Sequence, residues 1–515
     1  MRITNKIMQR NNLSNINTNK IYQDKLSTQM STQKKINRPS DDPVVAIRAL
    51  RLRSNVTEIT QYYSKNIPDA ESWLSVTEDA LKNLSEIITD MISQCTKGAN
   101  GDLTTDDRKI ILEQLKALGE EVYATGDADY AGRFVFTGYR TDTALTFQEE
   151  TEAAYTITEQ LDSSVIDTVT RVDTDKLLDI NTSNYMNIDV EEQAVTSVDA
   201  YRIRLAYNAC SDYEGANTSP KIEYYDENGT LQTWSGFGGT NGFELMHSYE
   251  DPYAYASQNA DALVFVPETG EVLLGSNRYE TLMATRDNEA TMVNEAEIRV
   301  TYEKADWAKG DLRPEHYFYC ESEGITFNDS YLAADAARQI IEYDVGFNQS
   351  IQVNSTADEA FSHGVGREVD DIVNAMQHVS DLETVKSNIE AMMELVTAGS
   401  TEEKQLQKQL DAVDKALTLA KDKEQKLFER GITAFQGYLD DTNLSITDVG
   451  TRSSKLELIK NRMQSQKTTF ETLKSENEDA DITEVAIQLS SAELTYEAAL
   501  MATGKVMQTT LLNFI

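Results

Sequence analysis

The sequence is poor in cysteine, histidine and proline, and it lacks any long apolar run. Its three cysteines, Cys95, Cys210 and Cys320, match no metal or redox spacing, and an odd number cannot all pair within one chain. None of the four histidines has metal-ligand spacing to another histidine or to a cysteine. The opening residues contain no apolar core of a secretory signal, and no stretch approaches the ~18 apolar residues of a membrane-spanning helix. We therefore expect no disulfide framework, no metal site and no membrane insertion.

Catalytic motifs are also missing. The sequence has no phosphate-binding P-loop, no GxGxxG after a strand, no HExxH zinc motif and no GxSxG nucleophile elbow. Asp41 and Asp42 resemble a catalytic carboxylate pair, but Pro39 and Pro43 flank them. An Asp followed by proline is typical of a helix start, with Asp42 as the N-cap. We expect neither an enzyme nor a cofactor.

Charge is strongly acidic and unevenly distributed. The net charge is −39, from 47 basic and 86 acidic residues, which disfavours binding to nucleic acids and to anionic membranes. Residues 1–65 nevertheless carry twelve basic and four acidic side chains, whereas the last forty residues carry seven acidic side chains and one lysine. The two ends could attract each other, or each could be a solvated helix face.

Both ends of the chain have helical patterns. Apolar residues spaced alternately three and four apart predict a coiled-coil seam, formed by Ile67, Ala70, Leu74, Thr77, Leu81, Leu84, Ile88, Met91 and Cys95. The seam ends at residues 98–101, a helix stop. Residues 1–36 are a weaker helix, because their apolar positions are sparse and polar residues fill the rest; these positions are Ile3, Ile7, Ile16, Leu26 and Met30.

Strand signals replace the helical pattern from about residue 150 to 345. Residues 221–225 and 230–234 flank Asn228-Gly229, and residues 263–266 and 271–274 flank Pro267–Gly270, so two hairpins are predicted. Residues 298–302 are a further strand. The aromatic run at 316–319 could stack on a sugar or a base, but a strand with one buried aromatic face is the interpretation favoured by its alternation.

Helix returns near Arg367, and no proline follows Pro314 to interrupt it. Two seams are predicted, one over residues 406–420 and one over 456–473. The tail repeats the spacing with Ile482, Val485, Leu489, Ala492, Tyr496 and Ala499, and it ends on an apolar run that contains Leu512. The predicted fold is mainly α, a coiled-coil helical rod formed by both termini with a β-rich domain inserted in the middle. The expected boundaries are 1–40, 41–145, 146–345, 346–478 and 479–515.

Several motifs together resemble those of the flagellin family. They are Met1–Asn5, Arg38–Ala46 followed by Arg48–Leu50, Asp69–Leu74, Lys97–Gly101, Gly132–Gly138, Val449–Arg452 and Glu478–Ile482. Flagellins usually have Asp-Asp-Ala-Ala-Gly where this chain has Asp41-Asp42-Pro43, so the chain is more similar to the hook-associated branch of the family. The resemblance covers about residues 1–145 and 340–515, and it does not extend to the longer central block.

The resemblance implies a structural subunit of the bacterial flagellum that joins hook to filament. It implies export unfolded by the flagellar export apparatus with a chaperone, an extracellular location, and pairing of both termini as coiled-coil helices. The partners would be other copies in a ring, other hook-associated proteins and flagellin. The interface is then expected at Ile3, Ile7, Ile16, Leu26, Met30, Ile482, Val485, Leu489, Ala492, Tyr496, Ala499 and Leu512.

Three alternatives remain open at this point. The chain could be flagellin itself, the bulk filament subunit. The central block could hold an enzyme or a glycan-binding adhesin, although a peptidase is disfavoured by the missing HExxH. Finally, the chain could be an unrelated cytoplasmic coiled-coil scaffold.

Overall fold

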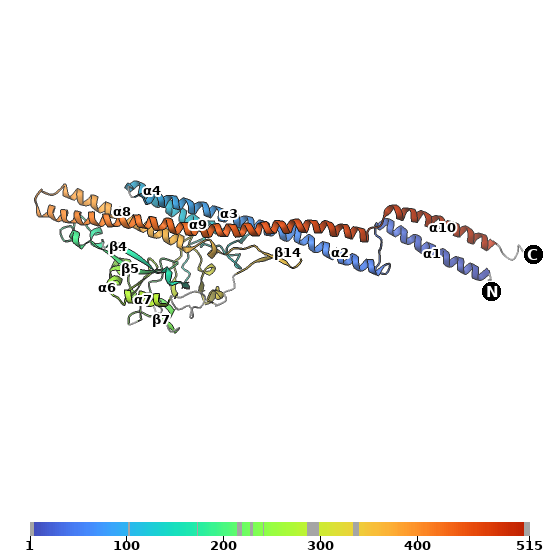
Figure 1. Ribbon diagram of the computed structural model, residues 1–515, viewed down its shortest axis with the longest axis horizontal. Helices are drawn as coiled ribbons and strands as arrows, with labels where there is room; N and C mark the ends of the chain where they lie inside the picture. Colours follow the sequence, from blue (N-terminus) through green and yellow to red (C-terminus); the bar gives the residue numbers. More distant parts are fainter. Residues whose placement is uncertain are drawn as a thin grey trace, which may run out of the picture. The chain divides into compact units, whose positions relative to one another are not determined.

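The computed structural model describes residues 5–100, 103–172, 174–213, 219–226, 230–239, 241–285, 298–332 and 339–508 (Figure 1). The chain forms two compact units. The first comprises Met1–Glu71, Tyr343–Ile351 and Ser454–Ile515, and the second comprises Ser72–Glu342 and Gln352–Ser453. The helices α3 (Ile67–Gly98) and α9 (Thr401–Glu478) contribute residues to both units.

The first unit is built mainly from helices. It contains α1 (Asn5–Thr32), α2 (Pro43–Gln61), the π-helical turn Tyr62–Asn66 and α10 (Ile482–Gln508). As expected, Asp42 caps α2: its side chain accepts hydrogen bonds from the backbone N–H groups of Val44 and Val45, and Pro43 takes the first helical position. This cap separates α2 from α1.

The seam predicted over residues 67–95 begins in the first unit and continues into the second, which starts at Ser72. All nine positions of the seam predicted over residues 67–95 are completely buried on α3. The helix ends at Gly98, and α4 (Thr105–Thr125) begins with a reciprocal capping box between Thr104 and Asp107. The remaining long helix of this unit is α8 (His363–Met393). The stop at Gly98 and the start after Thr104 are those that turn and capping residues predict, whereas α8 begins four residues before Arg367, where the return of helix was expected.

Two sheets make up the β-rich middle of the second unit. A six-stranded sheet has the order β13-β12-β3-β11-β6-β7, and a five-stranded sheet has the order β4-β5-β10-β9-β8. All neighbours are antiparallel except β8 and β9. The strands of the first are β3 (Tyr155–Leu161), β6 (Lys221–Tyr225), β7 (Leu231–Ser235), β11 (Ile298–Lys304), β12 (Tyr319–Ser322) and β13 (Ile325–Phe327). Those of the second are β4 (Asp167–Val172), β5 (Ser197–Arg204), β8 (Glu244–Leu245), β9 (Leu263–Val266) and β10 (Glu271–Leu274).

Smaller elements complete the described chain. Two-stranded sheets form between β1 (Asp129–Tyr130) and β2 (Arg133–Phe134), and between β14 (Glu342–Gly346) and β15 (Gln349–Gln352). Short helices interrupt the β-rich middle at α5 (Asp175–Leu178), α6 (Pro252–Gln258) and α7 (Ser276–Thr285). A mainly helical chain with terminal helices and a β-rich middle is therefore confirmed, whereas the coiled-coil rod and the five domain boundaries stay predictions.

Both predicted hairpins are confirmed. β6 pairs with β7, with Ile222 opposite Trp234, and β9 pairs with β10, with Phe265 opposite Val272. The Asn228-Gly229 turn lies outside the described residues. The strand expected over 316–319 is wrong: Pro314–His316 form a 3₁₀ turn, and β12 begins only at Tyr319. Pro314 explains this, because its fixed φ and missing N–H favour the first position of a helical turn.

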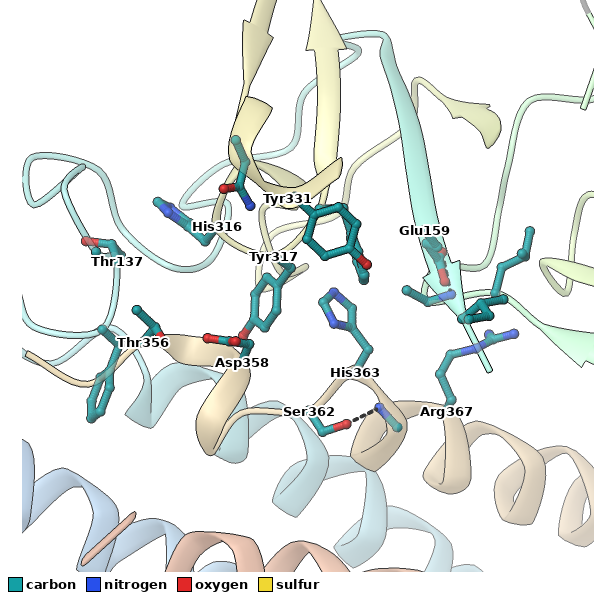
Figure 2. Close-up of a pocket in the computed structure, with 18 of the residues that line it drawn as sticks. Thr137, Glu159, His316, Tyr317, Tyr331, Thr356, Asp358, Ser362, His363 and Arg367 are labelled. Atoms are coloured by element: carbon teal, nitrogen blue, oxygen red, sulfur yellow. Dashed lines mark hydrogen bonds between the residues drawn. The ribbon is translucent and has the colours of Figure 1, made fainter. Parts of the chain in front are cut away.

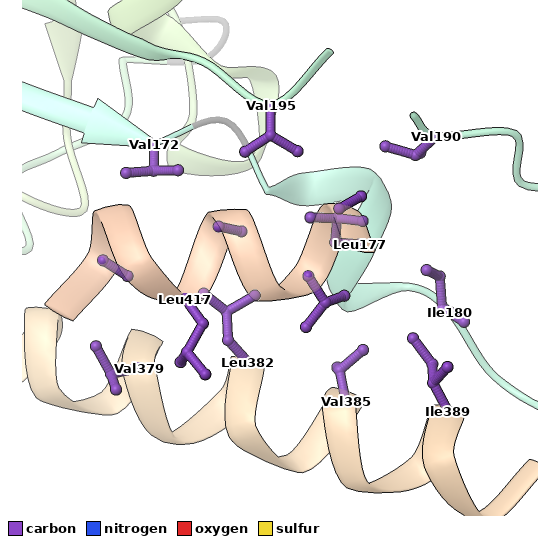
Figure 3. Close-up of a cluster of buried hydrophobic side chains, with 14 of the residues drawn as sticks. Val172, Leu177, Ile180, Val190, Val195, Val379, Leu382, Val385, Ile389 and Leu417 are labelled. Atoms are coloured by element: carbon purple, nitrogen blue, oxygen red, sulfur yellow. The ribbon is translucent and has the colours of Figure 1, made fainter. Parts of the chain in front are cut away.

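A hydrophobic cluster joins the segment around residues 172–195 to α8 and α9 (Figure 3). Val379, Leu382, Val385 and Ile389 follow one face of α8 at spacings of three and four residues, and Leu417 meets them from α9. The strand end and loop above supply Val172, Leu177, Ile180, Val190 and Val195. This apolar cluster fixes the β-rich middle to one end of the helix pair.

A buried ionic network, centred on Arg202 of β5, provides a second attachment. Its guanidinium pairs with Asp167 of β4 at 2.7 Å, with Glu271 of β10 at 2.6 Å and with Asp371 of α8 at 2.9 Å. Arg202 is only 2% exposed. Burial alone would favour the neutral acid at Asp371, but Arg202 and Arg204 outweigh it and lower its pKa to about 2.

Two further arginines extend this network to both helices. Arg204 of β5 contacts Asp371 at 2.9 Å and Glu368 of α8 at 2.5 Å. Arg430 of α9 contacts Glu368 at 3.1 Å and Asp167 at 2.8 Å. Strands and helices thus share carboxylates, so the orientation of the sheet on the helices is specified by charge as well as by apolar packing.

Candidate functional site

The two terminal helices pack against each other within the first unit, where Figure 1 shows α1 and α10 side by side. They run antiparallel, because Tyr22 lies opposite Gln488 whereas Leu26 packs with Val485. Leu26, Val485 and Ala492 are the buried residues of this contact, and Ala480 and Leu489 are half-buried beside them. The contact is narrow, as expected for helices with sparse apolar residues.

The predicted interface residues differ in their exposure to solvent. Leu26, Val485 and Ala492 are buried, and Ile16, Leu489, Tyr496 and Ala499 are half-buried. Ile7, Met30 and Ile482 are exposed. Ile3 and Leu512 lie outside the described residues. The role of all twelve residues at an interface between subunits stays a prediction.

Further apolar side chains on these helices are exposed, and sequence reasoning missed them. On α1 and α10 they are Met8, Leu13, Ile21, Ile487, Leu494, Leu500 and Met501, and on α2 they are Val44, Ile47 and Leu50. We call these exposed residues, with Ile7, Met30 and Ile482, the outer apolar set. The selection of one stripe per helix overlooked them, although a count of apolar positions on every face would have found them. The unit therefore presents apolar surface on more than one face of its helices.

A charged contact holds the junction between these helices. Arg53 of α2 donates two hydrogen bonds to Glu478 at the end of α9, from Nε to Oε1 at 2.6 Å and from Nη2 to Oε2 at 2.8 Å. Lys34, just after α1, pairs with Asp479 and lies 3.7 Å from Glu478. The hydrogen bonds from Arg53 lower the pKa of Glu478, and the hydrogen bond from Lys34 lowers the pKa of Asp479.

The backbone reinforces the same junction. The N–H of Lys35 donates to the carbonyl oxygen of Glu478 at 2.7 Å, and the N–H of Ala480 donates to that of Gln33 at 2.9 Å. Basic residues near the start of the chain thus pair with acidic residues near its end at this junction. The uneven charge distribution predicted an attraction between the two ends, but it could not predict which residues pair, since the partners lie more than 400 positions apart.

The described residues offer little else for chemistry. Among them, no group of three or more His, Cys, Asp and Glu side chains could hold a metal ion. No helix in the described ranges is long and apolar enough to cross a bilayer. The strongest functional feature is therefore the terminal helix pair with its outer apolar set.

Comparisons with known proteins agree with the motifs. Residues 3–141 match the sequence family described as bacterial flagellin N-terminal helical region. Flagellar hook-associated protein 3 of Salmonella typhimurium is 30% identical over 169 residues, 32% of this chain and 53% of that protein. Its Escherichia coli counterpart is 29% identical over 188 residues, 36% of this chain and 59% of that protein. The chain thus aligns with little more than half the length of these relatives.

The chain is also similar to a solved structure. Flagellar hook-associated protein 3 of Legionella pneumophila is 11% identical, with 82% of this chain and 96% of that chain covered, at a TM-score of 0.29. That score is too low to show a shared arrangement. The sequence match and the curated relatives carry the comparison: residues 3–141 are similar to the N-terminal helical region of bacterial flagellin, as the sequence motifs indicated.

Proposed function

We propose that this chain is a structural subunit of the bacterial flagellum that joins hook to filament and assembles through its paired terminal helices. The observation that carries the proposal is the outer apolar set on α1, α2 and α10. Helices in proteins gain most of their stability from packing against other surfaces, and the mutual contact of α1 and α10 is narrow. Similarity to hook-associated protein 3 supports neighbouring flagellar subunits as the source of those surfaces.

The partners follow from this role. The primary partner is a second copy of the chain, in a ring of like subunits, with other hook-associated proteins on one side and flagellin on the other. Delivery would use the flagellar export apparatus and a chaperone, and the place of action would be the extracellular flagellum at the hook–filament junction. No enzymatic activity is part of the proposal.

The location is tested by immunogold labelling of intact flagella with antibody raised against residues 150–345. A single band between hook and filament is expected. Label along the whole filament would instead identify a flagellin, the alternative that the family match keeps open. Absence of label from flagella would contradict both the junction subunit and the flagellin, and it would favour the third alternative, an unrelated cytoplasmic coiled-coil scaffold.

The assembly surface is tested by charge insertion on the outer apolar set. Leu13→Asp and Leu494→Asp alter side chains that are 61% and 68% exposed, so each monomer should keep its folded structure. Incorporation into flagella should be lost, because a carboxylate would be buried without a partner. Leu395→Asp is the control, since Leu395 is 87% exposed in the loop between α8 and α9. Equal incorporation of all three variants would contradict the assigned surface.

A further inference from the structure

A cavity of about 530 Å³ lies within the second unit, where the β-rich middle meets the start of α8 (Figure 2). Its volume falls in the range of small-molecule sites, about 300–1,000 Å³. Figure 2 shows His363 pointing into its centre from α8, with Tyr317 on one side and Tyr331 above. The assembly function proposed above uses none of these residues.

One wall of the cavity is aromatic. The ring of His363 lies 4.3 Å from that of Tyr317 and 5.1 Å from that of Phe318, measured between centroids, and Phe318 lies 5.9 Å from Tyr331. The 3₁₀ turn at Pro314–His316 creates this wall, because it places Tyr317 and Phe318 ahead of β12 instead of within it. Such rings offer electron-rich faces to polarised C–H groups.

The lining also offers hydrogen-bonding groups that have spare capacity. Within the described structure, the carboxylate of Asp358 and the hydroxyl of Thr356 have no side-chain hydrogen bond or ion pair, and Asp358 is exposed. His363 uses Nε2 on the hydroxyl of Tyr207 at 2.9 Å. Burial lowers the pKa of His363 to about 3, so the imidazole is neutral and its second nitrogen can bind an uncharged group.

The charges that line the cavity disfavour an anion. Arg204 is committed to Asp371 and Glu368, and Arg367 donates to the backbone carbonyl of Thr269 at 2.5 Å and pairs with Asp370. Both arginines in the described lining therefore already face carboxylates, and only Nε of Arg367 has no hydrogen-bond partner, so a phosphate or a carboxylate would compete with existing pairs. Asp358 adds an acidic group instead. A neutral ligand rich in hydroxyl groups suits this lining best.

We propose that this cavity binds one saccharide unit. The partly exposed rings of Phe318 and Tyr331 pack against its C–H faces, and Asp358, Thr356 and His363 bind its hydroxyl groups. The site needs both the β-rich middle and α8, because His363 is the first residue of that helix. Tests must therefore use the full chain.

The experiment is saturation-transfer NMR, followed by calorimetry, on the full chain with a panel of neutral hexoses and N-acetylhexosamines. At least one sugar should bind saturably in the millimolar range or tighter. Asp358→Asn and Phe318→Leu should each weaken that binding tenfold or more. Asp411→Asn, at an exposed position on α9 outside the cavity lining, should leave it unchanged.

Folding is checked by circular dichroism, and Asp358→Asn alters an exposed side chain, so a loss of binding by that variant would not reflect unfolding. Binding of methyl glycosides as well as free sugars would identify chain-terminal sugar units as the ligands, and binding of free sugars alone would identify the monosaccharide. No saturable binding by any sugar in the panel would overturn the proposal. If both cavity variants bound the sugar as tightly as the wild type, the sugar would have to bind outside this cavity, and the proposed site would be wrong.

Discussion

Gly98, the last residue of α3, has no room for a side chain. A Cβ built there would lie 2.4 Å from ring atoms of Phe428, which is completely buried. Overpacking of this kind costs about 1–3 kcal/mol, so we expect Gly98→Ala to lower the free energy of unfolding by that amount. Gly437→Ala is the matched control, because no atom lies within 4 Å of its Cβ on α9.

In the control, alanine should stabilise the helix by about 0.4–1 kcal/mol, since it restricts the unfolded chain. Urea titrations followed by circular dichroism measure both variants. The two substitutions should shift the midpoint in opposite directions. Equal shifts would show that the Phe428 ring moves aside without cost.

Glu159 should make stability fall as pH rises toward neutrality. Burial raises its pKa to about 7, against the partial compensation of hydrogen bonds from the Tyr302 hydroxyl and the Ala206 N–H. An unfolded glutamate titrates near pH ~4.3, so between about pH 4.5 and 7 the folded chain holds a proton that the unfolded chain has lost. The free energy of unfolding then decreases across that window, by up to about 3 kcal/mol.

The comparison with Glu159→Gln isolates this contribution, because all other groups titrate alike in the two proteins. Relative to the variant, the wild type should lose stability between pH 5 and about 7.5, as read from urea midpoints. Parallel pH profiles for the two proteins would show that Glu159 titrates normally.

At the scale of elements, the ionic network attaches strands to helices. Arg202→Met would leave Asp167, Glu271 and Asp371 without their shared cation. Loss of one partner from a buried ion pair costs about 3–5 kcal/mol, and we expect a loss of this size in thermal or urea unfolding of the second unit. Lys426→Met, which removes an exposed pair with Asp422, should leave the transition unchanged. A small effect at Arg202 would show that water or rearranged side chains replace it.

The terminal helix pair should depend on one leucine. Leu26→Ala removes the largest buried side chain between α1 and α10, whose other buried members are Val485 and Ala492. The free energy of unfolding should fall by about 2 kcal/mol, near the lower end for truncations of core leucines, because the residues around Leu26 are partly exposed. Hydrogen exchange of amides in residues 5–32 and 482–508 should accelerate, whereas Leu13→Ala, at an exposed position, should change it little.

Elements with local signals were predictable from sequence. Asp42 before Pro43 fixed a helix start, and two hairpins followed from turn residues between short apolar runs. The error at residues 316–319 arose where alternation suggested a strand but Pro314 began a helical turn. Periodicity identifies a buried face, yet it cannot identify which element covers that face.

Residues that act through long-range contacts could not be predicted in the same way. Nothing in the sequence distinguishes Arg53 and Glu478 from the many other charged residues, yet in the folded chain Nε of Arg53 lies 2.6 Å from Oε1 of Glu478. The network around Arg202 and the cavity beside His363 likewise join segments more than a hundred residues apart. For the terminal helices, sequence reasoning named one stripe, while exposure in the structure defined the outer apolar set.

For the whole molecule, charge opposes association of copies. A net charge of −39 gives strong repulsion between chains at low ionic strength. Salt shortens the screening length from about 30 Å at 0.01 M to about 8 Å at 0.15 M. We therefore expect self-association through the outer apolar set to increase with salt, as measured by analytical ultracentrifugation. Association that weakens with salt would show instead that attraction between the basic and acidic ends dominates.

The three native thiols make the chain a convenient starting point for site-directed labelling. Cys95, Cys210 and Cys320 are all buried, none forms a disulfide, and burial raises the pKa of each to about 12. Since the thiolate is the reacting species, maleimides should modify them very slowly in the folded protein. A cysteine introduced at an exposed position such as Leu395 would then carry a fluorophore or spin label selectively, with every native thiol left in place.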